Sequence, residues 1–295
     1  MAHKADEGGI SGHIATEENA VRRRLNGAGP DDRPSVTTHR LRSLLLGSWL
    51  SYRALFTWFN PLGYISSRIV MPVALTLIFG SVGRFAQGAA AGPVVGGMMI
   101  GVAFGSVYGI TLSIANERQF GTMGVWLATP QRLGTSIVVK SLPHLVDGQL
   151  GALLTLAIAC AAFGISLSPG RLAALMVCSV VAGLATAGFG VAIAACSIRF
   201  RDVFTAPNLA ESLLIVCGGV VVPASQLPAG LSHVSAIVPL SRSITAGRMV
   251  VSGGPLDVGL LAADLGVGLV WAVLGYAFLA FLVRGSRRAG AYDLV

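Results

Sequence analysis

Long apolar stretches with little charge are the feature that most constrains the fold of this chain. Of its 295 residues, 54% are hydrophobic and only 12% are charged. A soluble domain usually carries about 25% charged residues, so this chain has too little charge to cover a water-facing surface. Many apolar stretches approach or exceed the roughly 20 residues that a helix needs to span a bilayer. The sequence therefore predicts an all-α integral membrane protein with six transmembrane helices, over residues 62–82, 93–115, 142–165, 172–198, 207–222 and 258–283.

The positions of the positive charges predict the orientation of the chain in the membrane. The formal net charge is +8, and a basic chain is one sign of nucleic-acid binding. These charges, however, lie between and beside the apolar stretches, so no nucleic-acid partner is expected. Cytoplasmic loops carry the excess of Arg and Lys. Both termini are predicted to be cytoplasmic, because the opposite side carries only Arg84, Arg171, Arg242 and Arg248.

The ends of the chain differ from its apolar middle. Residues 1–37 are polar and cannot bury enough apolar surface to fold alone, which predicts a disordered cytoplasmic tail. Residues 38–60 predict an amphipathic helix that lies in the headgroup region of the membrane. The alternative is that this helix packs on the protein itself. Its apolar side would consist of Leu41, Leu45, Trp49, Tyr52, Phe56 and Phe59. Residues 61–284 then form the six-span domain, and residues 285–295 a cytoplasmic C-terminal tail.

The second predicted span carries a glycine at every fourth position. Residues this far apart lie on roughly one face of a helix, and small residues let two helix backbones approach closely in a membrane. The pattern predicts tight helix packing within one subunit. A surface that slides during a conformational cycle is the alternative. The four residues are Gly97, Gly101, Gly105 and Gly109.

The charged segment 117–132, between the second and third predicted spans, points to a contact in the cytoplasm. Thr122 is a good N-cap for a short helix because its side chain can satisfy the first free amides. Pro130 ends that helix. An exposed Trp126 and Leu127 on such a helix favour insertion into a groove of a partner protein. Anchoring at the membrane interface is the alternative.

Two further features of the apolar region are candidates for function. Residues 223–251, interrupted by prolines, predict a re-entrant pair of half-helices that enter the membrane from one side. Ionisable groups at membrane depth are costly and usually face a cavity or a partner. Asp147, Glu211 and Asp264 are such groups, and His144 lies within one helical turn of Asp147.

The sequence lacks the motifs of ATP hydrolysis and of other common enzymes. A P-loop needs Gly-Lys followed by Ser or Thr, and the only lysines, Lys4 and Lys140, follow His3 and Val139. No catalytic triad, metal-ligand spacing or dinucleotide fingerprint occurs in the sequence either. We therefore expect a chain that is not an enzyme and that binds no metal or cofactor itself.

Two motifs resemble those of a known family. Glu117-x-x-x-Gly121-Thr122, followed by Pro130-x-Arg132, resembles the coupling-helix signature of permease subunits in the type-2 ABC exporter class. The extracellular segment of that family, between its fifth and sixth spans, is similar to Pro223, Leu227-Pro228, Pro239 and Arg248. The similarity covers roughly residues 40–290 and is closest to permeases of the antibiotic and daunorubicin-resistance type. Met123-Gly124 departs from the family pattern, which often has a bulky apolar residue and an acid there.

The resemblance implies a permease subunit in a bacterial plasma membrane that exports an amphipathic, drug-like or lipid-like molecule. Two such subunits, identical or different, would form the transport path among the membrane lipids. Separate P-loop ATPase subunits would bind ATP and Mg and dock on the helix after Gly121. Glu117 would orient this coupling helix and Arg132 would fix its exit. Asp147, Glu211 and Asp264 would be candidates for the translocation path or for ion pairs.

Two other functions stay open at this point. Phe200-Arg201-Asp202 resembles an aromatic-Arg-Asp motif of permeases that export lipid-linked glycans. A secondary transporter driven by an ion gradient is the second alternative. Such a transporter would call for carboxylates near mid-bilayer and an inverted repeat. The sequence contains no convincing internal repeat.

Overall fold

The computed structural model describes residues 65–128, 133–197 and 202–289, together with residues 42, 45–50, 52, 53 and 63. Gly47–Val295 cluster into one unit and Met1–Leu46 into another, and the helices named below belong to the former. The predicted tail 1–37 lies outside the described residues. Within the predicted amphipathic segment 38–60, residues 45–50, 52 and 53 are helical.

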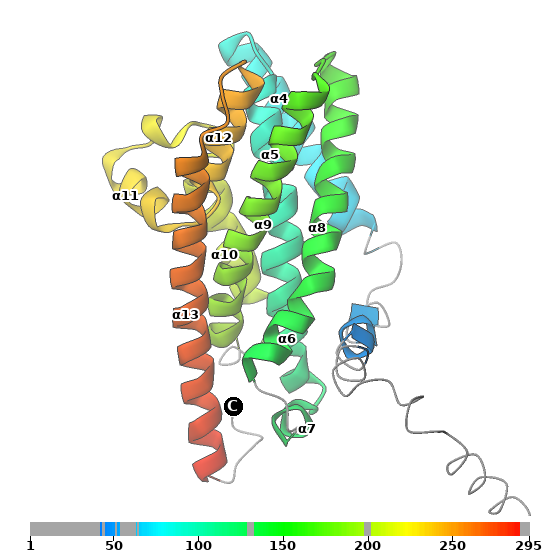
Figure 1. Cartoon of the computed structure of the whole chain (residues 1–295), viewed down its shortest axis with the longest axis vertical. Coiled ribbons are helices and arrows are strands. Elements are labelled where there is room, and N and C mark those ends of the chain that lie inside the picture. Colours follow the sequence, from blue (N-terminus) through cyan, green and yellow to red (C-terminus); the bar gives the residue numbers. More distant parts are fainter. Residues whose placement is uncertain are drawn as a thin grey trace, which may run out of the picture. The chain divides into compact units, whose positions relative to one another are not determined.

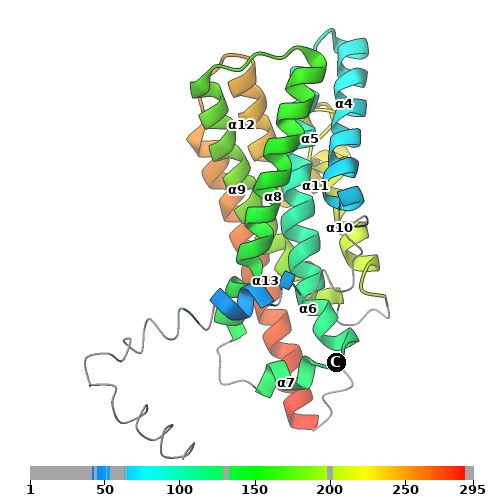
Figure 2. The same cartoon turned by 90° about the vertical axis from the view of Figure 1, so that its right-hand side faces the viewer.

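The regular structure of the described residues is entirely helical (Figure 1). A π-helical turn, η2 (Ser66–Val70), continues without a break into α4 (Met71–Gln87). The following elements are α5 (Ala91–Ala103), η3 (Phe104–Tyr108), α6 (Gly109–Gln119), α7 (Met123–Ala128), α8 (Leu133–Phe163), α9 (Pro169–Ser197), α10 (Thr205–Cys217), η4 (Ala224–Gln226), α11 (Ala229–Ile237), α12 (Ser241–Val251) and α13 (Val258–Ala289). The long helices run side by side, and the short α7 lies at the end of the bundle opposite to α12 (Figures 1 and 2).

The centre of the bundle is the continuous helix formed by α5, η3 and α6. Within its most apolar window, 94% of the residues are buried. Met98, Met99 and Ile100 are fully buried there. Its glycines and its lack of a polar face suit contact with helices on all sides, and it contacts α4, α8, α9 and α12. This helix therefore positions the elements around it.

The helices α9 and α13 pack with almost no side chain between them. A methyl group placed on Gly268 would overlap the backbone of Ala185, and one on Gly188 would overlap the backbone of Gly268. Gly275 faces the backbone of Ala192 in the same way. Such contacts give dispersion attraction along this stretch of the two helices, which is what holds helices together in a membrane.

Among the residues that the structure describes, four helices are long and apolar enough to cross a membrane: Ala91–Gln119, Leu133–Phe163, Pro169–Ser197 and Val258–Gly285. Met71–Ala86 and Thr205–Cys217 are shorter apolar helices. The outer faces of α8 and α13 expose large apolar side chains, for example Leu150 (61% exposed) and Phe281 (70% exposed). Such faces suit contact with lipid tails. The chain is a multi-pass membrane protein.

Several predicted boundaries were wrong; for example, α4 ends at Gln87 rather than at residue 82. The helix α8 begins at Leu133 rather than at residue 142, because its polar residues Ser136 and Ser141 are buried against neighbouring helices and do not mark a loop. The helix α10 ends at Cys217 rather than at residue 222, and Gly219 adopts a positive φ of 76° in the turn that follows. The helix α13 continues to Ala289, past the predicted end at residue 283.

Candidate coupling site and membrane pocket

The turn between α6 and α7 depends on a glycine and a threonine. Gly121 has φ +67°, which glycine adopts without steric cost. The Thr122 hydroxyl immediately precedes α7 and lies 2.6 Å from the Glu117 carboxylate oxygen Oε2 and 3.2 Å from the Glu117 carbonyl oxygen. The sequence pattern predicted that this hydroxyl accepts a hydrogen bond from a free amide of α7. In the structure the hydroxyl instead connects the start of α7 to the last turn of α6.

Lys140 of α8 connects the same turn to the next long helix. Its ammonium group forms an ion pair with the Glu117 carboxylate and lies 3.4 Å from the carbonyl oxygen of Ser113. The two side chains are mostly buried, with 10% of Lys140 and 20% of Glu117 exposed. Lys140 also lies over the Trp126 ring, 5.2 Å from its centroid, at the distance of a cation–π interaction.

The Trp126 side chain packs in part on the protein, so it is less exposed than the sequence predicted. It is half-buried, and its Nε1–H donates to the hydroxyl of Ser136 in α8 over 2.7 Å. The physical reason is that the indole meets two partners on α8, because Ser136 and Lys140 lie one helical turn apart on the same face. We call Glu117, Thr122, Trp126, Ser136 and Lys140 the coupling cluster.

The exposed apolar surface near this cluster comes from other residues. Val125 on α7 is 72% exposed, and Phe120 in the preceding turn is 46% exposed. Pro130 and Arg132 lie outside the described residues, as does the side chain of Leu127. Sequence reasoning missed Ser136 and Lys140. Lys140 carried a signal that could have found it, since it is the only lysine outside the N-terminal tail.

The predicted glycine face of the second span lies against two other helices, but its four positions differ. A methyl group on Gly97 would overlap Thr76 of α4, and one on Gly109 would overlap the His144 ring of α8. At Gly105 the overlap would be with the backbone of Gly148. Gly101 has more room: the added carbon would lie 3.6 Å from Pro72 and 4.0 Å from Ala152, which is ordinary contact.

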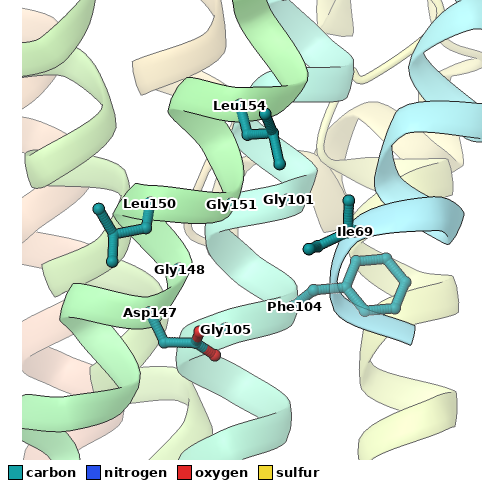
Figure 3. Close-up of a pocket in the computed structure, with 9 residues that line it drawn as sticks. All are labelled: Ile69, Gly101, Phe104, Gly105, Asp147, Gly148, Leu150, Gly151 and Leu154. Carbon is teal, nitrogen blue, oxygen red and sulfur yellow. The ribbon is translucent and has the colours of Figure 1, made fainter. Parts of the chain in front are cut away.

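A cavity of about 150 Å³ lies where η2, the α5–η3 helix and α8 meet (Figure 3). Its walls are mostly apolar, and glycines from two helices line it. Figure 3 shows the Asp147 side chain pointing towards Gly105. Asp147 is half-buried. The cavity lies beside the close contact between Gly105 and Gly148, so a shift of either helix would change its shape.

The other two predicted acids lie on other helices. Glu211, 5% exposed, is on α10. Asp264 of α13 is fully buried, and its carboxylate accepts hydrogen bonds from Leu240 and Ser243 at the start of α12. His144 packs against Gly109 and lies 5.4 Å from the Tyr52 ring, centroid to centroid. Among the residues that the structure describes, no three His, Cys, Asp or Glu side chains are grouped as a metal site.

Comparison with known proteins assigns this architecture to a family. The sequence profile of the family described as "ABC-2 type transporter" matches residues 46–251. The chain is also 28% identical, over 130 residues, to the probable multidrug ABC transporter permease YbhR of Escherichia coli strain K12 and to its counterpart in strain O157:H7. The match covers 44% of this chain and 35% of the length of those relatives. With its all-helical membrane fold, the chain therefore belongs to the ABC-2 type transporter family, as a membrane permease subunit.

Proposed function

We propose that the protein is the permease subunit of an ATP-driven exporter in a bacterial plasma membrane. Members of an ABC-2 permease family work with separate ATPase subunits, and the relatives in Escherichia coli are described as probable multidrug permeases. The observation that carries the proposal is the coupling cluster. A short helix at one end of the bundle is bonded to two long helices at once, while its neighbouring apolar residues remain exposed.

Six membrane spans with both termini in the cytoplasm fit the described helices. Residues 65–87 are helical without a break through η2 and α4, which is about 34 Å at 1.5 Å per residue and enough for a bilayer core. The helix α10 alone is only about 20 Å long. Helix α12 follows α10 and α11 in the chain and runs towards the proposed outer end of the bundle. There Arg248 donates to the carbonyl oxygen of Gly92 over 3.2 Å. In this arrangement α11 and α12 are the predicted re-entrant pair.

The proposed division of labour places ATP and Mg on the partner ATPase. The ATPase would dock on the face of α7 that carries Val125, since Trp126 faces inward. Movement of α7 would pull on α6 through the Thr122–Glu117 bond and on α8 through Trp126 and Lys140. These two helices carry the walls of the Asp147 cavity, because α6 continues η3. A displacement at α7 would therefore change the cavity within the membrane.

The proposed substrate is an amphipathic, drug-like or lipid-like molecule, moved out of the cytoplasm or the inner leaflet. Two permease subunits, identical or different, would enclose its path among the membrane lipids. Export of a lipid-linked glycan has less support. Of the motif that favoured it, only Asp202 is described, and this residue holds the turn before α10 by accepting from the Phe204 amide (3.2 Å) and the Thr205 hydroxyl (2.9 Å). These bonds within the turn explain the acid without a glycan.

Co-purification tests the docking proposal directly. The chain is expressed with candidate ATPase subunits and extracted in detergent, and we expect one ATPase to remain bound. Val125→Asp should release it, because a charge on the docking face must lose its water against an apolar groove. Phe85→Asp is the matched control. Phe85 is 96% exposed at the end of α4, away from α7, so this variant should retain the ATPase.

A further variant distinguishes residues that contact the ATPase directly from residues that only position α7. Trp126→Phe keeps the apolar ring but removes the donor to Ser136, so it should weaken retention less than Val125→Asp does. An ATPase that stays bound in Val125→Asp would place the docking surface elsewhere. The absence of any bound ATPase, with transport that follows an ion gradient, would make the protein a secondary transporter.

A further inference from the structure

The last helix, α13, contacts elements at both ends of the bundle. Leu279 and Val283, towards its end, are buried in the same apolar cluster as Ile114 of α6 and Met123 of α7. Asp264, near its start, is buried against α12. One continuous helix separates Asp264 from Val283, by about 28 Å at 1.5 Å per residue. A rigid element thus connects the α7 region with the opposite half of the molecule.

The Asp264 carboxylate holds the first turn of α12. It accepts the Leu240 amide at 3.1 and 3.2 Å from its two oxygens, the Ser243 amide at 3.2 Å, and the Ser243 hydroxyl. A negative charge at a helix N-terminus meets unpaired amides and the positive end of the helix dipole. A buried carboxylate needs such partners to offset the loss of water. The cap of α12 is therefore supplied by a different helix, α13.

The residue at this junction has a strained backbone. Leu240 has φ +94°, and it is the one non-glycine residue with a positive φ among the residues described. Its side chain is fully buried. A bulky residue keeps such a conformation only where its surroundings hold it. Here the Asp264 bonds hold the backbone. Trp271, also on α13, donates to the carbonyl oxygen of Ile237 over 2.8 Å.

We propose that α13 transmits movement of α7 to the α11–α12 segment, with Asp264 as the positioning residue at the receiving end. The inference rests on the proposed function for its input at α7. A displacement that reaches α13 through the apolar cluster that it shares with Met123 moves Asp264. The first turn of α12 follows because three donors share that carboxylate. Leu240, already strained, is the point where the segment changes conformation.

Hydrogen exchange tests the junction without any need for transport. Asp264→Asn keeps the size of the side chain but replaces one acceptor with an amide that faces donors. Exchange in a peptide covering residues 238–246 should accelerate by about tenfold or more, while residues 185–195 of α9 exchange as in the wild type. Ser243→Ala is the milder second variant and should give a smaller local increase. Unchanged exchange in both variants would overturn the proposed role of Asp264.

Asp257→Asn is the matched control. Asp257 immediately precedes α13, and its carboxylate accepts the amide of Leu260 in the first turn of that helix over 3.0 Å. Asn also caps helices well, and residue 257 does not touch α12 through this bond. Residues 238–246 should therefore keep their wild-type exchange in this variant. If exchange accelerated in Asp257→Asn as much as in Asp264→Asn, the effect would come from a general loosening of α13 and not from the Asp264 bonds.

The transmission step is tested in the complex with the ATPase. A spin label is attached at Ser232→Cys on α11, in a variant whose four native cysteines are alanine. We expect ATP with Mg to change the mobility of the label in the otherwise wild-type complex and in Asp257→Asn. The change should be absent in Asp264→Asn and smaller in Ser243→Ala. A label that responds equally with Asp264→Asn, or never responds, would overturn the transmission. Failure of any ATPase to bind would instead refute the docking proposal, and the exchange measurement would still decide the role of Asp264.

Discussion

Glu117→Gln is expected to lower ATP-driven transport by about tenfold or more while the protein still inserts and still binds its ATPase. The substitution keeps the size of the side chain and removes the charge that pairs with Lys140. A hydrogen bond to a charged group contributes about 1.5–3 kcal/mol, and 1.4 kcal/mol corresponds to a factor of ten. Since this pair joins α6 to α8, its loss should weaken the transfer of motion from α7. Transport into inside-out vesicles, normalised to bound ATPase, measures the effect.

A double-mutant cycle with Lys140→Met separates coupling from loss of charge. Each single variant leaves one mostly buried charge without its partner, and such a charge is strongly destabilising. The double variant leaves neither charge, so its defect should be much smaller than the two single defects combined. Gln119→Ala, on the exposed surface beside Glu117, is the control and should transport normally. Normal transport in Glu117→Gln would remove this residue from the mechanism.

Gly105→Ala should destabilise the folded protein by about 1–3 kcal/mol, which is the usual cost of overpacking a well-packed core. The added methyl group would overlap the backbone of Gly148 in α8, so the two helices must move apart. A backbone cannot rotate away as a side chain can. A lower melting temperature in detergent measures the effect, by about 2–4 °C per kcal/mol for a chain of this size. Transport should fall as well, because the change lies at the Asp147 cavity.

Gly101→Ala is the matched control, one helical turn away on the same helix. Its methyl group meets only ordinary contacts, at 3.6 Å and beyond. Alanine is also favoured over glycine in a helix by about 0.5–1 kcal/mol. The melting temperature should therefore stay the same or rise slightly. Equal destabilisation by both substitutions would mean that the two positions pack alike.

Much of the architecture can be read from the residue pattern because a bilayer imposes simple requirements. Apolar length and low charge indicated an all-helical membrane protein, and the family profile and the four long apolar helices confirm that class. The motif from Glu117 to Arg132 indicated a type-2 ABC permease, which the comparisons also confirm. The number of spans stays a prediction, since α4 and α10 are shorter than the other four helices.

Contacts between residues far apart in the chain had no comparable signal in the sequence. The sequence alone determined that this chain enters a membrane as helices, that small residues line one of them, and that a short charged segment follows it. Only the tertiary structure decided that Trp126 faces Ser136, that Lys140 pairs with Glu117, and that Asp264 caps a helix other than its own. The physical reason is that hydrophobicity and helix period are properties of a local stretch. A hydrogen bond or a close backbone contact depends on which helix becomes the neighbour, and the packing of the whole bundle sets that.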